Sequence, residues 1–298
     1  MLNHILEAFL ILTPLFFLIA GGWILSVFFP ISEDSLTRVL SDFFMPLLVF
    51  ASLYSSKITP RDTISLLGTV VFMVFSLYAI VWIYCRISGA DLRGLGMPVI
   101  FMNSGFLGIP LMQLWSGTEA MNMIIVFDQL QTIFIFSLGF VIVAGGFSLK
   151  GLRMALLSPI LWAVFLGFFF NGLGIPLPEA VLESCRFAGG AAAPMAAFIV
   201  GCSLSSKPPR VDLHVIAGLV MRFGFGLGIG IAAVYLFGLE GLMKTVVLVS
   251  SALPAAVFSY VLPTRYGVSA GDAQSIVILS TILGIITIPL SFSLAQLL

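Results

Sequence analysis

The sequence predicts an all-α protein that crosses a membrane many times. Hydrophobic residues fill 60% of the 298 positions and charged residues only 9%, and the mean hydropathy is +1.18, values far from those of soluble domains. Apolar stretches of about 20 residues recur along the chain, and one such stretch is long enough to span a bilayer as a helix. The shorter, alternating segments typical of a membrane β-barrel are absent from the sequence.

Ten helices are expected, because the apolar stretches are separated by short connections that contain proline or glycine. The first stretch is too long for a signal-peptide core and no basic leader precedes it, so we expect a retained helix. No connection is long enough for a soluble domain. The expected helices cover residues 4–28, 34–55, 64–86, 95–116, 119–145, 154–173, 179–204, 213–238, 241–263 and 271–296.

Two landmarks recur at one offset, which predicts an internal duplication. Pro46 and Pro194 lie in similar apolar contexts, 148 residues apart, and each is followed by Ser-Ser-Lys. Chance spacing is the alternative, since prolines are ordinary in membrane helices. With five helices in each half, the second copy would be inverted relative to the membrane. We therefore expect inverted repeats over residues 1–149 (helices 1–5) and 150–298 (helices 6–10).

The fourth and ninth helices are expected to break at matching positions. The segment Asn103-Ser104-Gly105-Phe106-Leu107-Gly108-Ile109-Pro110 holds two glycines and a proline within six residues. In a helix interior a proline costs about 3 kcal/mol and a glycine about 1 kcal/mol. The second break is expected around Ser251 and Pro254, again at an offset of 148 residues. Such paired interruptions indicate a transporter's binding site, because irregular backbone at membrane depth must be buried or line a watery cavity.

The breaks are expected to form a site for a small anion such as a carboxylate. Free N–H groups should start the second half-helices near Ile109 and near Ala255, and helix N-termini attract anions. The carbonyls that end the first half-helices would offer partial negative charge to a cation. No dedicated lysine or arginine is expected there. The candidate substrate-binding residues are Asn103, Ser104, Gly105, Gly108, Ile109, Pro110, Ser250, Ser251, Pro254 and Ala255.

Asp128 is the candidate ion-coupling residue, with Gln131 and Thr132 three and four positions later on the same helix face. A charged aspartate near the bilayer centre costs about 2.5–3.5 kcal/mol on insertion scales, so it should face the protein interior. Its counterpart in the second repeat is Ile276, so the duplicated scaffold does not require an acid there. The preferred interpretation is a proton or cation site, and the alternative is a buried aspartate that serves helix packing.

Two further charged residues lie within expected spans. Arg222 is expected at the membrane interface, beside a surface helix over residues 211–218, with a mid-span position as the alternative. Asp42, about two turns into the second helix, is a candidate for lining a vestibule. The three cysteines are scattered and fit neither a disulfide framework nor metal-ligand spacing. No metal site and no cofactor is expected.

Lysines and arginines in the short connections predict that both termini are extracytoplasmic in the cell (inner or plasma) membrane. The net charge of 0 and the lack of a basic patch give no indication of nucleic acid. Membrane lipids are the expected surroundings, and a homodimer is left open. The cytoplasmic ends would hold Arg38, Arg86, Arg93, Lys150, Arg153, Lys207, Arg210 and Arg265, against Lys57, Arg61, Arg186 and Lys244 on the opposite side.

The residue pattern resembles the auxin efflux carrier family, whose bacterial members include organic-acid permeases. The likeness covers essentially the whole chain and is carried by residues 103–110, 250–254, 279–283 and 287–289, and by the run 158–201. It implies a fold similar to bile acid symporters and sodium/proton antiporters. In that fold helices 1, 2, 6 and 7 form a scaffold panel, and helices 3–5 and 8–10 form a moving core with helices 4 and 9 crossed.

The resemblance also implies a role for the polar residues at the crossing. In plant members, asparagines beside the crossing hold the substrate carboxylate, and Asn103 matches that position. Ser250 and Ser251 stand where the second asparagine would be, so this chain departs from the plant pattern there.

Together these features predict a secondary active transporter of a small organic anion, a mono- or dicarboxylate, working by alternating access. A proton or sodium is the expected coupling ion. A potential-driven uniporter and a carrier of a cation or a neutral solute are the alternatives. An ion channel is less favoured, because the sequence holds no recognisable ring of charges. An enzyme is not expected, because no nucleophile with a base and no metal-ligand cluster is recognisable.

Overall fold

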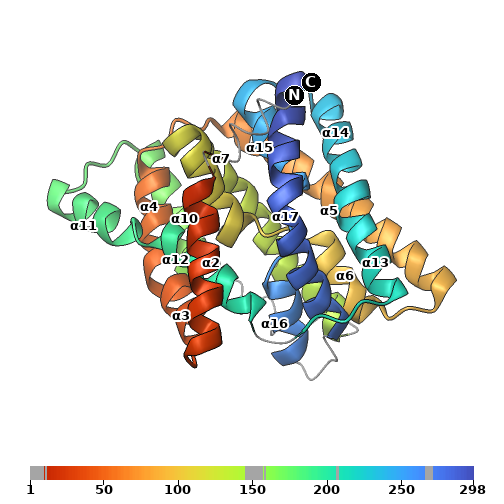
Figure 1. The fold of residues 1–298 in the computed structure, drawn as a ribbon. Coiled ribbons are helices and arrows are strands. Elements are labelled where there is room, and N and C mark those ends of the chain that lie inside the picture. Colours follow the sequence, from red (N-terminus) through yellow and green to blue (C-terminus); the bar gives the residue numbers. More distant parts are fainter. Residues whose placement is uncertain (1–9, 11, 145–156, 158, 206–207, 266–270) are drawn as a thin grey trace.

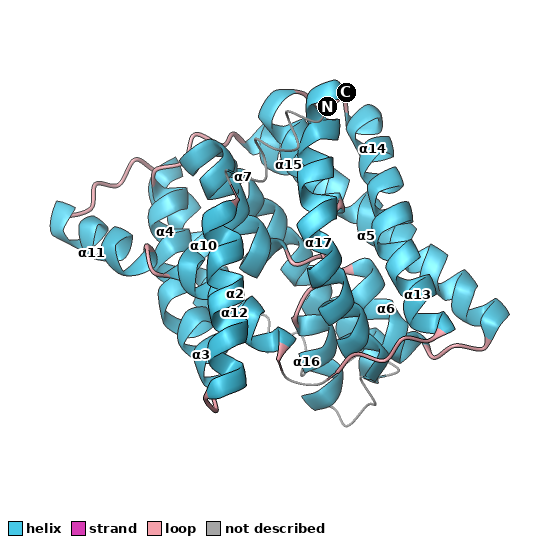
Figure 2. Ribbon diagram, in the orientation of Figure 1, coloured by secondary structure: helices cyan, strands magenta, loops and turns pink. Residues whose placement is uncertain are grey.

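The computed structural model describes residues 10, 12–144, 157, 159–205, 208–265 and 271–298. Over these residues the chain is helical and has no strand beyond a single antiparallel bridge between Met102 and Ala255 (Figure 1, Figure 2). Six helical stretches within this part are long and apolar enough to cross a membrane. The predicted all-α class is therefore confirmed, and the long apolar helices agree with a polytopic membrane protein.

The element bounds follow the expected spans to within a few residues wherever the structure describes them. In chain order, with η for a π-helical turn, the elements are α2 (Thr13–Phe28), α3 (Glu33–Val39), η1 (Leu40–Phe44), α4 (Met45–Tyr54), α5 (Pro60–Ser88), α6 (Leu92–Ile100), η2 (Ser104–Gly108), α7 (Ile109–Phe134), η3 (Ile135–Gly139), α8 (Phe140–Ala144), α10 (Pro159–Gly172), α11 (Glu179–Gly189), α12 (Ala192–Leu204), α13 (Leu213–Val220), η4 (Met221–Phe225), α14 (Gly226–Phe237), α15 (Gly241–Ser251), α16 (Phe258–Arg265) and α17 (Gly271–Leu297).

Local sequence explains where individual helices begin and end. Helix α5 begins at Pro60, four residues before the expected start, because Thr59 and Asp62 form a capping box in which each side chain accepts the other's backbone N–H. It ends at Gly89, whose φ of 75° suits glycine. Within α7, Ser116 and Gly117 leave helical geometry, and Gly117 has a φ of 70°. The boundary expected between the helices over 95–116 and 119–145 is therefore present as a sharp turn.

The helices form two groups that pack side by side. Helices α2, α3, α4, α10, α11 and α12 form one group, which we call the panel, and α5, α6 and α13 to α17 form the other, which we call the core (Figure 1). Helix α7 lies between them and contacts both. In the panel, α2 and α12 approach so closely that a Cβ on Gly22 would collide with the Phe198 carbonyl, and one on Gly201 with the Ile19 carbonyl.

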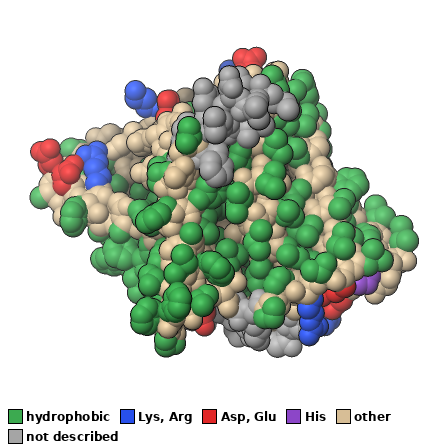
Figure 3. Space-filling view, viewed as in Figure 1, with side chains coloured by type: hydrophobic (Ala, Val, Ile, Leu, Met, Phe, Trp, Pro, Cys, Tyr) green, Lys and Arg blue, Asp and Glu red, His purple; other side chains and the backbone are tan. Residues whose placement is uncertain are grey.

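The outer surface has the polarity expected of a membrane protein. Large apolar side chains are exposed on the outward faces of both groups, among them Phe17 with 76% of its surface accessible and Phe28 with 74%. In the space-filling view, hydrophobic side chains cover the flank of the visible face, while charged side chains gather towards its ends (Figure 3). This distribution suits helices whose flanks contact lipid and whose ends contact water.

Both expected helix interruptions are present, but each second half-helix begins at another residue than predicted. Residues 101–103 separate α6 from η2, so the first break ends at Ser104 and not near Ile109. Gly105, Gly108 and Pro110 lie inside the helix that follows, because a π-helical turn directly before the proline takes up the irregularity. The second break covers residues 252–257, and its half-helix begins at Phe258 rather than near Ala255.

Candidate functional site

The two interruptions meet and hydrogen-bond to each other. The Asn103 N–H donates to the Pro254 carbonyl at 2.8 Å, and the Ala256 N–H donates to the Phe101 carbonyl at 2.9 Å. The Ala255 N–H donates to the Ser280 hydroxyl at 3.0 Å. The expectation of a free N–H near Ala255 is therefore wrong, because extended backbone buried in protein satisfies its donors internally. The site must be built from other groups.

Gln131 holds the first interruption in place from helix α7. Its amide nitrogen donates to the Met102 carbonyl at 2.8 Å and to the Ser104 hydroxyl at 3.0 Å, while its oxygen accepts the Met102 N–H at 3.2 Å. The side chain is almost fully buried. It thus gives Met102 the pair of hydrogen bonds that a neighbouring strand would give. The structure brings this predicted ion-coupling residue to the break as a support for the backbone.

Asp128 lies directly against the start of the second half-helix. The Ser104 hydroxyl donates to its Oδ1 at 2.7 Å, and the Gln129 amide donates to its Oδ2 at 3.0 Å. A Cβ on Gly105 would lie only 3.1 Å from Oδ1, so glycine leaves the room that the carboxylate needs. Within the described part of the chain, no lysine or arginine forms an ion pair with Asp128. The hydrogen bonds to its carboxylate therefore come from two neutral side chains.

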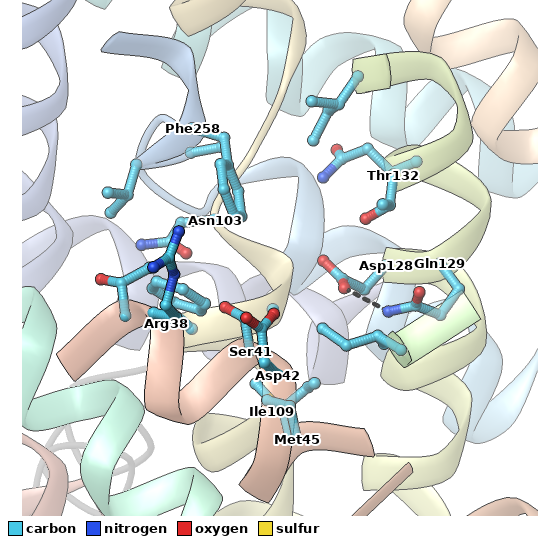
Figure 4. Close-up of a pocket in the computed structure, with 18 of the residues that line it drawn as sticks. Arg38, Ser41, Asp42, Met45, Asn103, Ile109, Asp128, Gln129, Thr132 and Phe258 are labelled. Carbon is cyan, nitrogen blue, oxygen red and sulfur yellow. Dashed lines mark hydrogen bonds between the residues drawn. The ribbon is translucent and has the colours of Figure 1, made fainter. Parts of the chain in front are cut away.

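A cavity of about 350 Å³ lies between the panel and the core and reaches the first interruption (Figure 4). In the close-up, Asn103 and Arg38 lie towards one side, while Asp128, Gln129 and Thr132 lie towards the other. Its described charged lining consists of one guanidinium, on Arg38, and four carboxylates. These acidic residues are Glu33, Asp34, Asp42 and Asp128.

Asn103 lines this cavity and carries a buried side-chain nitrogen with no hydrogen-bond partner. The residue is only 4% exposed. A buried polar group normally finds a partner, and leaving one without a partner costs about 1–3 kcal/mol. A turn of this amide about its last side-chain bond would bring the nitrogen to the cavity, where a ligand that accepts a hydrogen bond could satisfy it.

The predicted site residues divide into those that face the cavity and those that do not. Asn103, Gly105, Ile109, Asp128, Gln131 and Thr132 line it. Ser104 supports Asp128 from a buried position, and Gly108 packs against Leu253 and Ile124. From the second break, the lining comes from residues 256–258. The remaining candidates, all buried and absent from the lining, are Pro110, Ser250, Ser251, Pro254 and Ala255.

Arg222 is the charged residue whose place the sequence analysis assigned wrongly. Residues 213–237 form one continuous helical stretch, in which Arg222 lies in the π turn η4 and is completely buried. Its guanidinium donates to the Val99 carbonyl at 2.9 Å, the Ile100 carbonyl at 3.3 Å and the Ser251 carbonyl at 2.8 Å. The carbonyl ends expected to attract a cation are thus occupied by an arginine of the chain itself.

A sequence signal for this placement exists beside the arginine. A Cβ on Gly226 would lie 2.5 Å from Nη2 of Arg222 and 3.0 Å from the Ser251 carbonyl. Glycines occupy the alternate positions 224, 226, 228 and 230 after this arginine. Gly226, one turn after Arg222 within an apolar span, leaves the space in which the guanidinium lies.

Comparisons with known proteins cover nearly the whole chain. The sequence model of the family described as "Membrane transport protein" matches residues 7–292. The chain is similar to an uncharacterized transporter of Methanothermobacter thermautotrophicus, with 28% identity over 285 residues that cover 92% of this chain and 93% of the relative. It is also 28% identical to an uncharacterized transporter of Methanocaldococcus jannaschii over 221 residues, which cover 69% of each chain.

Proposed function

The chain belongs to the membrane transport protein family, which is the auxin efflux carrier family that its motifs resemble, and from this premise we propose that it is a secondary active transporter of a small organic anion. The proposed architecture has ten transmembrane helices in two inverted repeats over residues 1–149 and 150–298. Transport would proceed by alternating access, with the core moving against the panel. The cavity between these two groups supports this proposal, because a substrate bound there contacts both of them.

The observation that carries the anion assignment is the unpaired amide of Asn103. Its Nδ2 is buried without a partner, and a turn of the amide would let it donate a hydrogen bond to a carboxylate in the cavity. The guanidinium of Arg38 lines the same cavity and supplies the positive charge that a dicarboxylate needs for its second group. We assign Asn103 to the carboxylate nearer the crossing and Arg38 to the mouth of the cavity.

Asp128 is proposed as the coupling residue, because it contributes one of the four negative charges of the cavity and lies beside the first interruption. Four carboxylates against one guanidinium repel an anion when all of them are ionised. Binding a proton or a cation at Asp128 removes one of these repulsions next to Asn103. Entry of the anion would then be favoured together with the coupling ion, which is the requirement for symport.

The proposed orientation makes this an inward-facing conformation. The cavity is lined by Glu33, Asp34, Leu157, Pro159 and Ile160. These residues lie at helix ends that the distribution of lysine and arginine assigns to the cytoplasm. With both termini extracytoplasmic in the cell membrane, the cavity would open to the cytoplasm and the crossing would close its outer end.

The acidic lining also favours a second candidate, a carrier of an organic cation. In that case the four carboxylates would attract the substrate, and Asn103 would donate to a hydroxyl or carbonyl group on it. The two candidates predict opposite effects of charge. Neutralising Asp42, on the panel side of the cavity, should strengthen anion binding and weaken cation binding.

Counterflow in proteoliposomes separates the candidates. Proteoliposomes that contain the purified protein and are loaded with unlabelled malonate should take up labelled malonate. Organic cations and neutral solutes should not compete with this uptake. Arg38→Gln should raise the half-saturation concentration, whereas Arg93→Gln, an exposed arginine outside the cavity, should leave it unchanged. Competition by cations alone would reject the anion assignment, and accumulation driven by a membrane potential alone, without a gradient of a coupling ion, would favour a uniporter.

A further inference from the structure

The crossing contains a positive charge that the proposed substrate does not contact. Arg222 is fully buried, outside the cavity lining, and its guanidinium donates to the carbonyls that end α6 and α15. These carbonyls belong to Val99 and Ile100 on one half-helix and to Ser251 on the other. Among the described residues its hydrogen bonds go to carbonyl oxygens alone, and no carboxylate balances its charge.

Helix ends of this kind favour a cation. The last carbonyls of a helix lack intrahelical partners, and each C-terminus carries about half a negative charge. Two such ends that converge in a dry interior carry together about one negative charge, matching the charge of one guanidinium. Carbonyl oxygens arranged in this way are also the ligands that hard cations such as sodium take from proteins.

The surroundings fit a guanidinium rather than a smaller ion. Its planar fork lets Nη1 reach the end of α6 while Nη2 reaches the end of α15. Gly226 is required for this fit, because a Cβ there would overlap Nη2 at 2.5 Å. The same helical stretch therefore provides both the charge and the space for it.

We propose that Arg222 is the permanent cation of the crossing, filling the carbonyl site that a sodium ion would otherwise need. Transport then does not depend on sodium at the half-helix ends, and the movable ion of the cycle is the one bound at Asp128. Arg222 acts as a positioning residue, since it holds the ends of α6 and α15 together without touching the substrate. The transport measurements that test this inference rest on the proposed carrier function, whereas the melting measurements do not.

Removing the guanidinium should create a site for a free cation. In Arg222→Ala the three carbonyls keep their positions around an empty space, so millimolar guanidinium chloride should raise the melting temperature saturably in a choline chloride buffer. Wild type and Arg93→Ala, a surface arginine on α6, should show no such rise. If Arg222→Ala shows no rise, free cations do not occupy this site and the proposal is wrong.

The transport measurement separates this site from Asp128. Counterflow by Asp128→Asn, in which no carboxylate at that position can bind sodium, should not respond when sodium is replaced by potassium or choline on both sides of the membrane, whereas a saturable sodium requirement in this variant would overturn the proposal. If Arg222→Ala does not fold, Arg222→Lys is the variant to test. It keeps the charge but loses the planar fork, and added sodium should not restore the transport activity that it loses. Absence of all uptake in wild type would count against the carrier function, while the melting measurements would still decide the role of Arg222.

Discussion

Replacing Asn103 by alanine tests the proposed carboxylate contact most directly. The backbone N–H of residue 103 would still donate to the Pro254 carbonyl, so the pairing of the two interruptions should survive. Only the side-chain amide is removed, and its nitrogen has no partner within the protein. The variant should therefore lose substrate affinity while its melting temperature without substrate stays close to that of wild type.

The size of the loss follows from the type of hydrogen bond. A hydrogen bond to a charged group contributes about 1.5–3 kcal/mol, which corresponds to about 10- to 150-fold in affinity. The half-saturation concentration for malonate counterflow should rise by this factor. Stabilisation of the purified protein by malonate should shift to correspondingly higher concentrations.

A matched control distinguishes binding from packing. Asn122, in helix α7, is another buried asparagine, 5% exposed and outside the cavity lining. Asn122→Ala should change the melting temperature more than it changes the half-saturation concentration. If Asn103→Ala transports malonate with unaltered half-saturation and rate, the amide does not contact the substrate and the reasoning is refuted.

Three further changes test the surroundings of the site. Asp128→Asn should abolish ion-driven accumulation but preserve counterflow, as measured in proteoliposomes, and persistent accumulation would remove Asp128 from the coupling mechanism. Gly105→Ala should cost about 1–3 kcal/mol of stability and impair accumulation, because the added Cβ would lie only 3.1 Å from the Asp128 carboxylate. Gly228→Ala is the control for melting temperature, because a Cβ there has no neighbouring atom within 4 Å. Tyr260→Phe removes the 2.5 Å hydrogen bond from the core to Glu33 of the panel, so hydrogen exchange at the cavity mouth should change, and an unchanged exchange pattern would mean that this bond does not hold the two groups together.

Much of the fold was predictable because its signals are local. Apolar length identified the helices, and a capping box or a glycine marked several of their ends. Glycine and proline located both interruptions, although the exact start of each half-helix was missed. A π turn before Pro110 let the helix include residues that by propensity alone should have broken it.

The site was predictable where its residues come from neighbouring turns of one or two helices. Asn103 and Asp128 were identified from polar chemistry at unusual depth, and both line the cavity. Ser250 and Ser251 were expected beside them, yet they face the buried interior of the core. The direction in which an irregular segment presents its side chains depends on what it pairs with, and here it pairs with residues 101–103.

The sequence by itself determined the membrane class, the paired interruptions and the acid beside the first of them, because composition and helix-breaking residues act over a few turns. Only the tertiary structure decided that Arg222 belongs to the crossing. Its partners Val99 and Ser251 lie 123 and 29 residues away along the chain, and no local pattern tells an arginine which helix ends will converge on it. A buried charge is stable only where such distant carbonyls meet it, so its role follows from packing.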